Sequence, residues 1–167
     1  MKGFNRFLLQ FRIIVRQWLF FMLYLSFFRF AFILYFRNKM DSATAAADVL
    51  LAALTGLRYD SMVSTNWILL PFLLSIAPGF MNLDRFAVRV RGAFGAAFVI
   101  VTTVSWVVTF GYFKEYNEQF NHFIFNLYYD DTKAIFRTIW ADYHPLSSLL
   151  LIMIVSTLAL LLQKRFL

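Results

Sequence analysis

Long stretches without a charged side chain are the feature that most constrains this fold. Residues 93–113 and 146–162 contain no Asp, Glu, Lys or Arg. About 20 helical residues cover the roughly 30 Å hydrocarbon layer of a bilayer. Apolar residues make up 61% of the chain and charged residues 15%, whereas soluble domains are about half apolar and a quarter charged. The sequence therefore predicts an all-α integral membrane protein, with one transmembrane domain over residues 1–167.

Four membrane spans are predicted, each long enough to cross the hydrocarbon layer. Their ranges are 18–36, 61–80, 93–113 and 146–162. The first span lacks the small-residue cleavage site of a signal peptide, so we interpret it as a retained anchor. A five-span alternative adds residues 43–57, but that segment is only 15 residues long and includes Asp48. We therefore favour four spans.

The distribution of charge predicts the orientation of these spans. Lys and Arg accumulate in the short cytoplasmic segments that flank spans. With the N-terminus inside, the inner segments hold nine basic residues and one acid, and the outer segments hold six basic residues and eight acids. We therefore expect a multi-pass protein of a bacterial inner membrane with both termini in the cytoplasm.

Two segments at the outer face are predicted to be interfacial helices. The Ala-rich segment 42–57 follows a possible helix cap at Asp41 or Ser42, and we expect it to bend near Gly56 into the second span. The segment 114–144 places apolar residues at helical spacing. These are Phe120, Phe123, Ile124, Leu127 and Tyr128. Helices that are apolar on one side and charged on the other lie in the headgroup plane.

The sequence "GLRYD" at 56–60 places charges at the entrance of the second span. Counted from Trp18, Arg29 lies roughly 16 Å along the first span, which is near the bilayer middle. A charge at that depth needs a partner, and Asp48 or Asp60 could supply one unless Arg29 extends to the interface.

Two interpretations of these charges remain open. In the first, Arg29, Arg58, Asp48 and Asp60 form ion pairs that fix helix packing. In the second, Arg58 and Tyr59, with Arg29, bind a lipid phosphate while Asp60 orients Arg58. Arginine suits that role because its planar fork meets phosphate with two hydrogen bonds.

Other chemistry has little support in the sequence. It contains no P-loop, nucleophile elbow, HExxH motif or Gly-rich dinucleotide turn. His122 and His144 would need a third ligand such as Asp131 to hold a metal, so no catalytic or metal residue is predicted. Nucleic acid is not an expected partner, because the basic residues punctuate apolar spans instead of forming a face on a soluble domain.

Two stretches of the chain resemble a known family. "GLRYD" before the second apolar stretch, and "YFKEYNEQFNHFIFNLYYDDTKAIFRTIWADYHP" before the last, resemble the membrane part of the lipoteichoic acid synthase family. That family includes phosphoglycerol and phosphoethanolamine transferases of the alkaline phosphatase and sulfatase superfamily. The resemblance covers most of residues 10–165.

The resemblance implies a longer parent enzyme of the cell envelope. In the family, five spans precede an extracytoplasmic domain that binds a divalent metal and uses a Thr nucleophile. The fifth span and that domain lie outside this chain, so the chain is expected to hold no cofactor and no catalytic residue. We expect it to anchor the enzyme and present phospholipid. The alternative is a small non-catalytic membrane protein that packs against other helices or forms a homo-oligomer.

Overall fold

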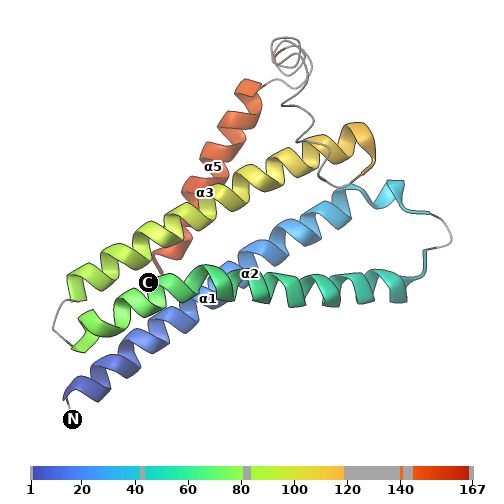
Figure 1. Cartoon of the computed structure of the whole chain (residues 1–167). Coiled ribbons are helices and arrows are strands. Elements are labelled where there is room, and N and C mark those ends of the chain that lie inside the picture. Colours follow the sequence, from blue (N-terminus) through green and yellow to red (C-terminus); the bar gives the residue numbers. More distant parts are fainter. Residues whose placement is uncertain (1, 42–43, 81–83, 119–139, 141–144, 166–167) are drawn as a thin grey trace, which may run out of the picture. The chain divides into compact units, whose positions relative to one another are not determined.

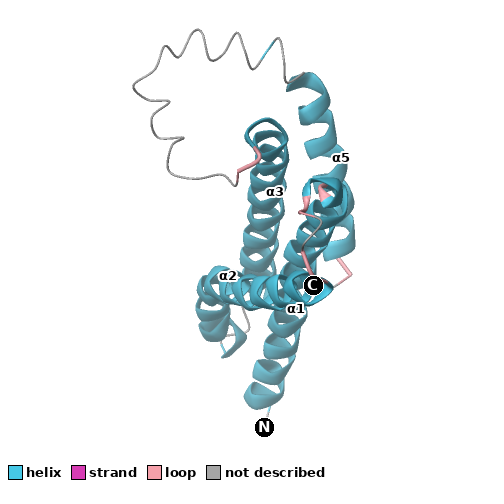
Figure 2. Ribbon diagram, turned by 90° about the vertical axis from the view of Figure 1, so that its right-hand side faces the viewer, coloured by secondary structure: helices cyan, strands magenta, loops and turns pink. Residues whose placement is uncertain are grey.

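The structure is a computed structural model that describes residues 2–41, 44–80, 84–118, 140 and 145–165. Over these residues it is helical and contains no strand. The long helices are α1 (Lys2–Tyr35), α2 (Ala46–Phe80), α3 (Asp84–Tyr116) and α5 (Pro145–Gln163), and the short 3-10 helix η1 (Arg37–Lys39) follows α1 (Figures 1 and 2). The predicted all-α fold is confirmed.

The helices are longer than the predicted spans. The first span was placed at 18–36, but α1 begins at Lys2, so Arg29 lies six residues before the end of a 34-residue helix. The third and fourth predicted spans lie within α3 and α5. Most of the second predicted interfacial segment falls outside the described residues, as do His122, Asp131 and His144.

The first predicted interfacial segment joins the second predicted span within one helix. Residues 46–57 and 61–80 form one continuous helix, α2, and not two separate segments. The residues expected to lie in the headgroup plane extend the second predicted span by about three turns. No strong helix breaker stands between the two segments, because an isolated glycine costs a helix only about 1 kcal/mol.

Three of the described helices are long and apolar enough to cross a membrane: Phe4–Tyr35, Arg85–Tyr116 and Pro145–Gln163. Four were predicted, and α2 is the one that does not qualify. The structure thus supports a membrane protein with three candidate spans among the described residues.

The chain divides into two compact units. Unit 1 comprises Met1–Val99 and Leu160–Leu167, and unit 2 comprises Ile100–Ala159. In unit 2, the hydroxyl of Ser156 on α5 donates to Thr103 Oγ1 on α3 at 3.3 Å. Helix α3 ends where Asn117 adopts a left-handed conformation (φ 55°) and donates its backbone N–H to the carbonyl of Phe113. Asparagine tolerates this conformation better than most residues.

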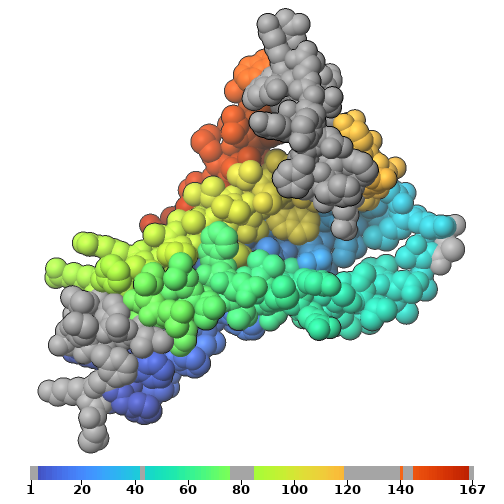
Figure 3. All heavy atoms as spheres, in the orientation of Figure 1, coloured from blue at the N-terminus to red at the C-terminus, as the bar shows by residue number. Residues whose placement is uncertain are grey.

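In unit 1, α1 and α2 pack antiparallel. Asp60 bonds to Arg29, the indole N–H of Trp18 donates to Thr65 Oγ1 at 3.0 Å, and the Phe72 ring contacts that of Phe11. The buried residues of α2 lie on one stripe, and most of them are small or polar. They are Gly56, Asp60, Ser64, Ile68, Pro71 and Ser75. Small residues let two membrane helices approach closely. In Figure 3 the described side chains of α2 form a continuous band along the face of the molecule that is shown.

The first half of α3 completes the core of unit 1. The rings of Phe21 on α1 and Phe98 on α3 stack with their centroids 3.9 Å apart, and both side chains are almost fully buried. Trp67 on α2 packs edge-on against Phe98 and donates its N–H to the carbonyl of Phe94 at 3.0 Å. Three helices therefore share one aromatic centre.

Candidate functional site

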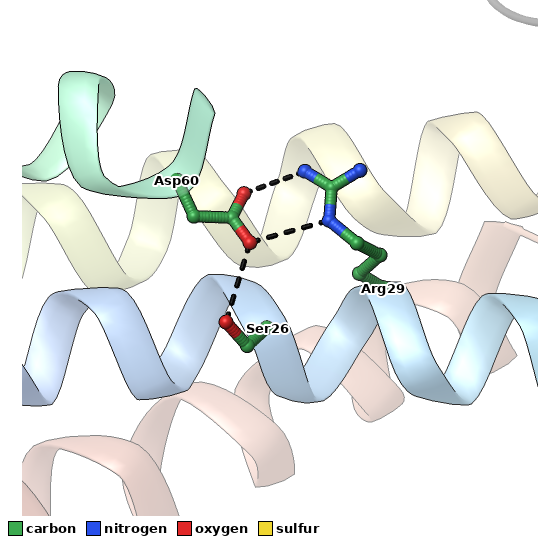
Figure 4. Close-up of polar contacts among 3 residues, drawn as sticks. All are labelled: Ser26, Arg29 and Asp60. Carbon is green, nitrogen blue, oxygen red and sulfur yellow. Dashed lines mark hydrogen bonds and ion pairs between the residues drawn. The ribbon is translucent and has the colours of Figure 1, made fainter. Parts of the chain in front are cut away.

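An ion pair joins α1 to α2 in unit 1. Arg29 Nη2 lies 2.6 Å from Asp60 Oδ1, and Arg29 Nε lies 3.2 Å from Asp60 Oδ2 (Figure 4). The hydroxyl of Ser26 donates to the same Oδ2 at 3.3 Å. The Asp60 side chain is 5% exposed and that of Arg29 is 28% exposed. Both carboxylate oxygens are thus occupied by side chains from α1.

Helix α2 brings Asp60 into place through a glycine one turn earlier. A Cβ at Gly56 would overlap the guanidinium of Arg29. Because glycine has no side chain, the helix surface there is low enough for the arginine to lie across it. The "GLRYD" sequence therefore supplies both the space for Arg29 and its counter-charge, four residues apart on one helix face.

Arg58 and Tyr59 occupy a different part of the α2 surface. Both are exposed, Tyr59 at 60%. Arg58 is two residues from Asp60, so the two side chains leave the helix in nearly opposite directions. The hypothesis that Asp60 orients Arg58 is therefore wrong, because the Asp60 carboxylate is occupied by Arg29 and Ser26.

Asp48 does not join this cluster. It lies exposed in the first turn of α2 and accepts a hydrogen bond at 3.2 Å from the backbone N–H of Ala45. An acidic side chain at this position satisfies one of the backbone donors left open at a helix start and also interacts favourably with the helix dipole. Of the two acids considered as partners for Arg29, the structure pairs Arg29 with Asp60.

A second polar cluster was missed by the sequence analysis. Arg91 on α3 is 1% exposed, and its Nη1 donates to the Oε1 of Gln10 on α1. Gln17, also on α1, donates from Nε2 to the backbone carbonyl of Arg91 at 2.9 Å. Gln163, at the end of α5, packs with Gln17 over Gly95. Side chains from three helices therefore meet around one buried arginine.

The sequence carried a signal for this second cluster. Gln10 and Gln17 are seven residues apart in a helix, so they share a face, and each stands within an otherwise apolar stripe. Polar residues in membrane helices turn inward because lipid offers them no hydrogen-bond partner. Arg91 lies close in sequence to Arg85 and Arg89, but its position on the buried face of Ala87 and Gly95 separates it from these two exposed arginines.

The chemistry available to these groups is binding and positioning. Arg58 offers an exposed planar cation and Tyr59 an exposed hydroxyl beside it, whereas Arg29 and Arg91 are engaged within the protein. Among the described residues, no group of three or more His, Cys, Asp or Glu side chains is arranged to hold a metal ion.

No model of a protein family, no curated protein and no solved structure matches the chain.

Proposed function

We propose that the chain is the membrane-anchoring and lipid-presenting N-terminal part of a bacterial cell-envelope enzyme. The enzyme is a phosphoglycerol or phosphoethanolamine transferase of the lipoteichoic acid synthase type, whose catalytic domain would bind the divalent metal. The observation that carries the proposal is the exposure of Arg58 and Tyr59 on α2, the helix that the Arg29–Asp60 ion pair holds against α1.

In this proposal Arg29 and Arg58 have different roles. Arg29 is held by Asp60 and fixes the level of α2 along α1. Arg58 is left to bind the phosphate of a phospholipid through two of its N–H groups, and the Tyr59 hydroxyl donates a further hydrogen bond. A phosphate held in this way would be presented at the membrane surface. The residues of this chain bind and orient the lipid and carry out no chemical step.

We also propose that α2 is a fourth membrane span and that both termini are cytoplasmic. The support is its packing, because α2 runs antiparallel to the candidate span α1 from Asp60 to Phe72 and contacts α3 through Trp67. A helix that lies beside two spans over this length shares their depth. Between residues 62 and 74 its exposed residues are largely apolar, and they include Met62, Val63, Leu69, Leu70, Leu73 and Leu74.

The length of the native polypeptide tests the functional proposal. An antibody raised against residues 46–58 should detect, in membranes of the source cell, a chain whose mass is several times 19.7 kDa. In that longer protein, Arg58→Gln should lower transferase activity, and Arg37→Gln, which alters another exposed arginine, should leave it unchanged. Normal activity of a correctly folded Arg58→Gln protein would rule out the lipid-binding role.

The alternative is a small non-catalytic membrane protein that packs against the helices of a partner or of a second copy. It is favoured by the surface of α3 around Gly92, where a Cβ would meet no atom within 4 Å and the neighbouring Ala93 is exposed. Such a surface admits another helix at close range. Detection of a native species of 19.7 kDa alone would support this function over the transferase.

A further inference from the structure

Unit 1 carries a cluster of exposed basic residues, remote in sequence from Arg58. We call it the basic cluster, and its members come from the start of α1, the start of α3 and the residues that follow α5. They are Arg6, Arg12, Arg16, Arg85, Arg89, Lys164 and Arg165. Each of the seven is exposed.

Buried contacts bring these three chain segments together. The Arg91 side chain bonds to Gln10, which lies between Arg6 and Arg12 in the sequence. The Arg91 backbone carbonyl accepts a hydrogen bond from Gln17, the residue after Arg16. Gln163, which precedes Lys164, packs over Gly95 beside Gln17. The three chain segments that carry the basic cluster are therefore held together by contacts within unit 1.

The spacing of the arginines concentrates positive charge. Arg12 and Arg16 are four residues apart on α1, and Arg85 and Arg89 are four residues apart on α3, so each pair shares a helix face. Like charges at this spacing destabilise a helix. Among the side chains that the structure describes, no carboxylate forms an ion pair with any of these four arginines. An external anion would compensate this charge.

The surroundings of the cluster indicate what kind of anion this is. Exposed apolar side chains alternate with the arginines along the same helices. They are Leu8, Leu9, Phe11, Val15, Phe86, Val88, Leu161 and Leu162. A free phosphate or a nucleic acid would leave these side chains in water, whereas a phospholipid covers them with acyl chains and brings its phosphate to the arginines.

We propose that the basic cluster binds the headgroups of anionic phospholipids. Phosphatidylglycerol, an anionic phospholipid, is a suitable probe of this binding. The guanidinium groups of α1 and α3 bind the phosphodiester, and the adjoining apolar side chains contact the acyl chains. This site is separate from the lipid-binding site proposed at Arg58. It would hold this end of unit 1 at an anionic membrane surface.

Native mass spectrometry of the full chain in a neutral detergent tests the proposal. Dioleoyl phosphatidylglycerol should bind more tightly than dioleoyl phosphatidylcholine. The variant Arg85→Gln/Arg89→Gln should weaken phosphatidylglycerol binding by about fivefold for each arginine removed, because each basic residue near an anionic surface contributes on the order of 1 kcal/mol. Phosphatidylcholine binding should not change. A second variant, Arg12→Gln/Arg16→Gln, should behave in the same way.

Controls separate this site from general charge effects. The matched variant Arg37→Gln/Lys39→Gln removes two exposed basic residues outside the cluster and away from Arg58, and it should retain the binding of phosphatidylglycerol. Unchanged tryptophan fluorescence and elution volume would show that each variant is folded. Equal binding of the two lipids, or an equal loss in the Arg37→Gln/Lys39→Gln variant, would overturn the proposal. Displacement of the lipid by glycerol 3-phosphate or by a short RNA at equimolar concentration would do so too.

Discussion

Arg29 and Asp60 meet through two parallel contacts, Nη2 to Oδ1 at 2.6 Å and Nε to Oδ2 at 3.2 Å, across the boundary between α1 and α2. This forked arrangement matches the planar guanidinium to the planar carboxylate, and it fixes the rotation of each helix as well as its level. The pair is asymmetric in burial, because Asp60 is enclosed and Arg29 is partly exposed. Removing the acid should therefore have a different effect from removing both charges.

Asp60→Asn is expected to destabilise the protein by about 2 kcal/mol. Breaking one half of a buried pair costs about 3–5 kcal/mol because the remaining charge is left uncompensated, and the partial exposure of Arg29 reduces that cost. Reversible unfolding in mixed micelles, followed by tryptophan fluorescence, would measure the loss. Asp48→Asn, which changes an exposed acid on the same helix, should cost no more than about 1 kcal/mol.

The double variant Arg29→Met/Asp60→Leu should recover most of the stability lost in Asp60→Asn. Two apolar side chains of similar volume leave no buried charge, and such replacements are often neutral or stabilising. The same unfolding assay compares the two proteins. A double variant no more stable than Asp60→Asn would mean that the pair contributes to stability through its own bonding and not only by avoiding an unpaired charge.

Gly56→Ala and Gly92→Ala should have opposite effects. At Gly56 a Cβ would overlap the Arg29 guanidinium, so the arginine must move and its bonds to Asp60 are disturbed. We expect a loss of about 1–3 kcal/mol, the usual result of overpacking. At Gly92 a Cβ meets no atom, and alanine is the better helix former by roughly 1 kcal/mol. Equal destabilisation in both variants would contradict the close approach of α1 and α2 at Gly56.

Phe98→Ala should be among the most destabilising single changes in unit 1. The ring stacks on Phe21 and contacts Trp67, and its removal would leave a cavity where three helices meet. Truncating a buried phenylalanine typically costs about 3–5 kcal/mol. Phe30→Ala, at a side chain 55% exposed on α1, serves as the control and should cost less than about 1 kcal/mol. The difference in unfolding free energy between the two variants is the quantity to measure.

The sequence predicted the elements that depend on local composition. Uncharged runs long enough to cross a bilayer indicated α3 and α5, because a spanning segment must bond its backbone internally and a charged side chain facing lipid is costly. The first span was placed after basic residues such as Arg12 and Arg16, whereas the helix α1 that contains it begins at Lys2. A helix can extend beyond the hydrocarbon layer into the headgroups, so a charge marks where lipid ends and not where the helix ends.

The candidate site was only partly predictable, because helix periodicity gives the face of a residue but not what packs against that face. The positions of Arg29 and Asp60 in apolar surroundings indicated that each needs a partner. Choosing Asp60 over Asp48 required the antiparallel register of α1 and α2, which depends on Gly56 and on aromatic contacts such as that between Phe11 and Phe72. The burial of Arg91 depended likewise on the contacts between helices.

Cysteine labelling would establish whether α2 crosses the membrane. The chain contains no Cys, so a single introduced thiol reports on one position. Leu50 and Leu69 are both exposed on α2, at 61% and 51%, and lie about five turns apart. If α2 is a span, Leu69→Cys should be protected from a charged, membrane-impermeant maleimide applied from either side, because lipid excludes the reagent and disfavours the thiolate. Leu50→Cys should react from the outer side alone. Rapid labelling of both thiols in intact membranes would instead place α2 at the membrane surface, and the chain would then cross the bilayer without it.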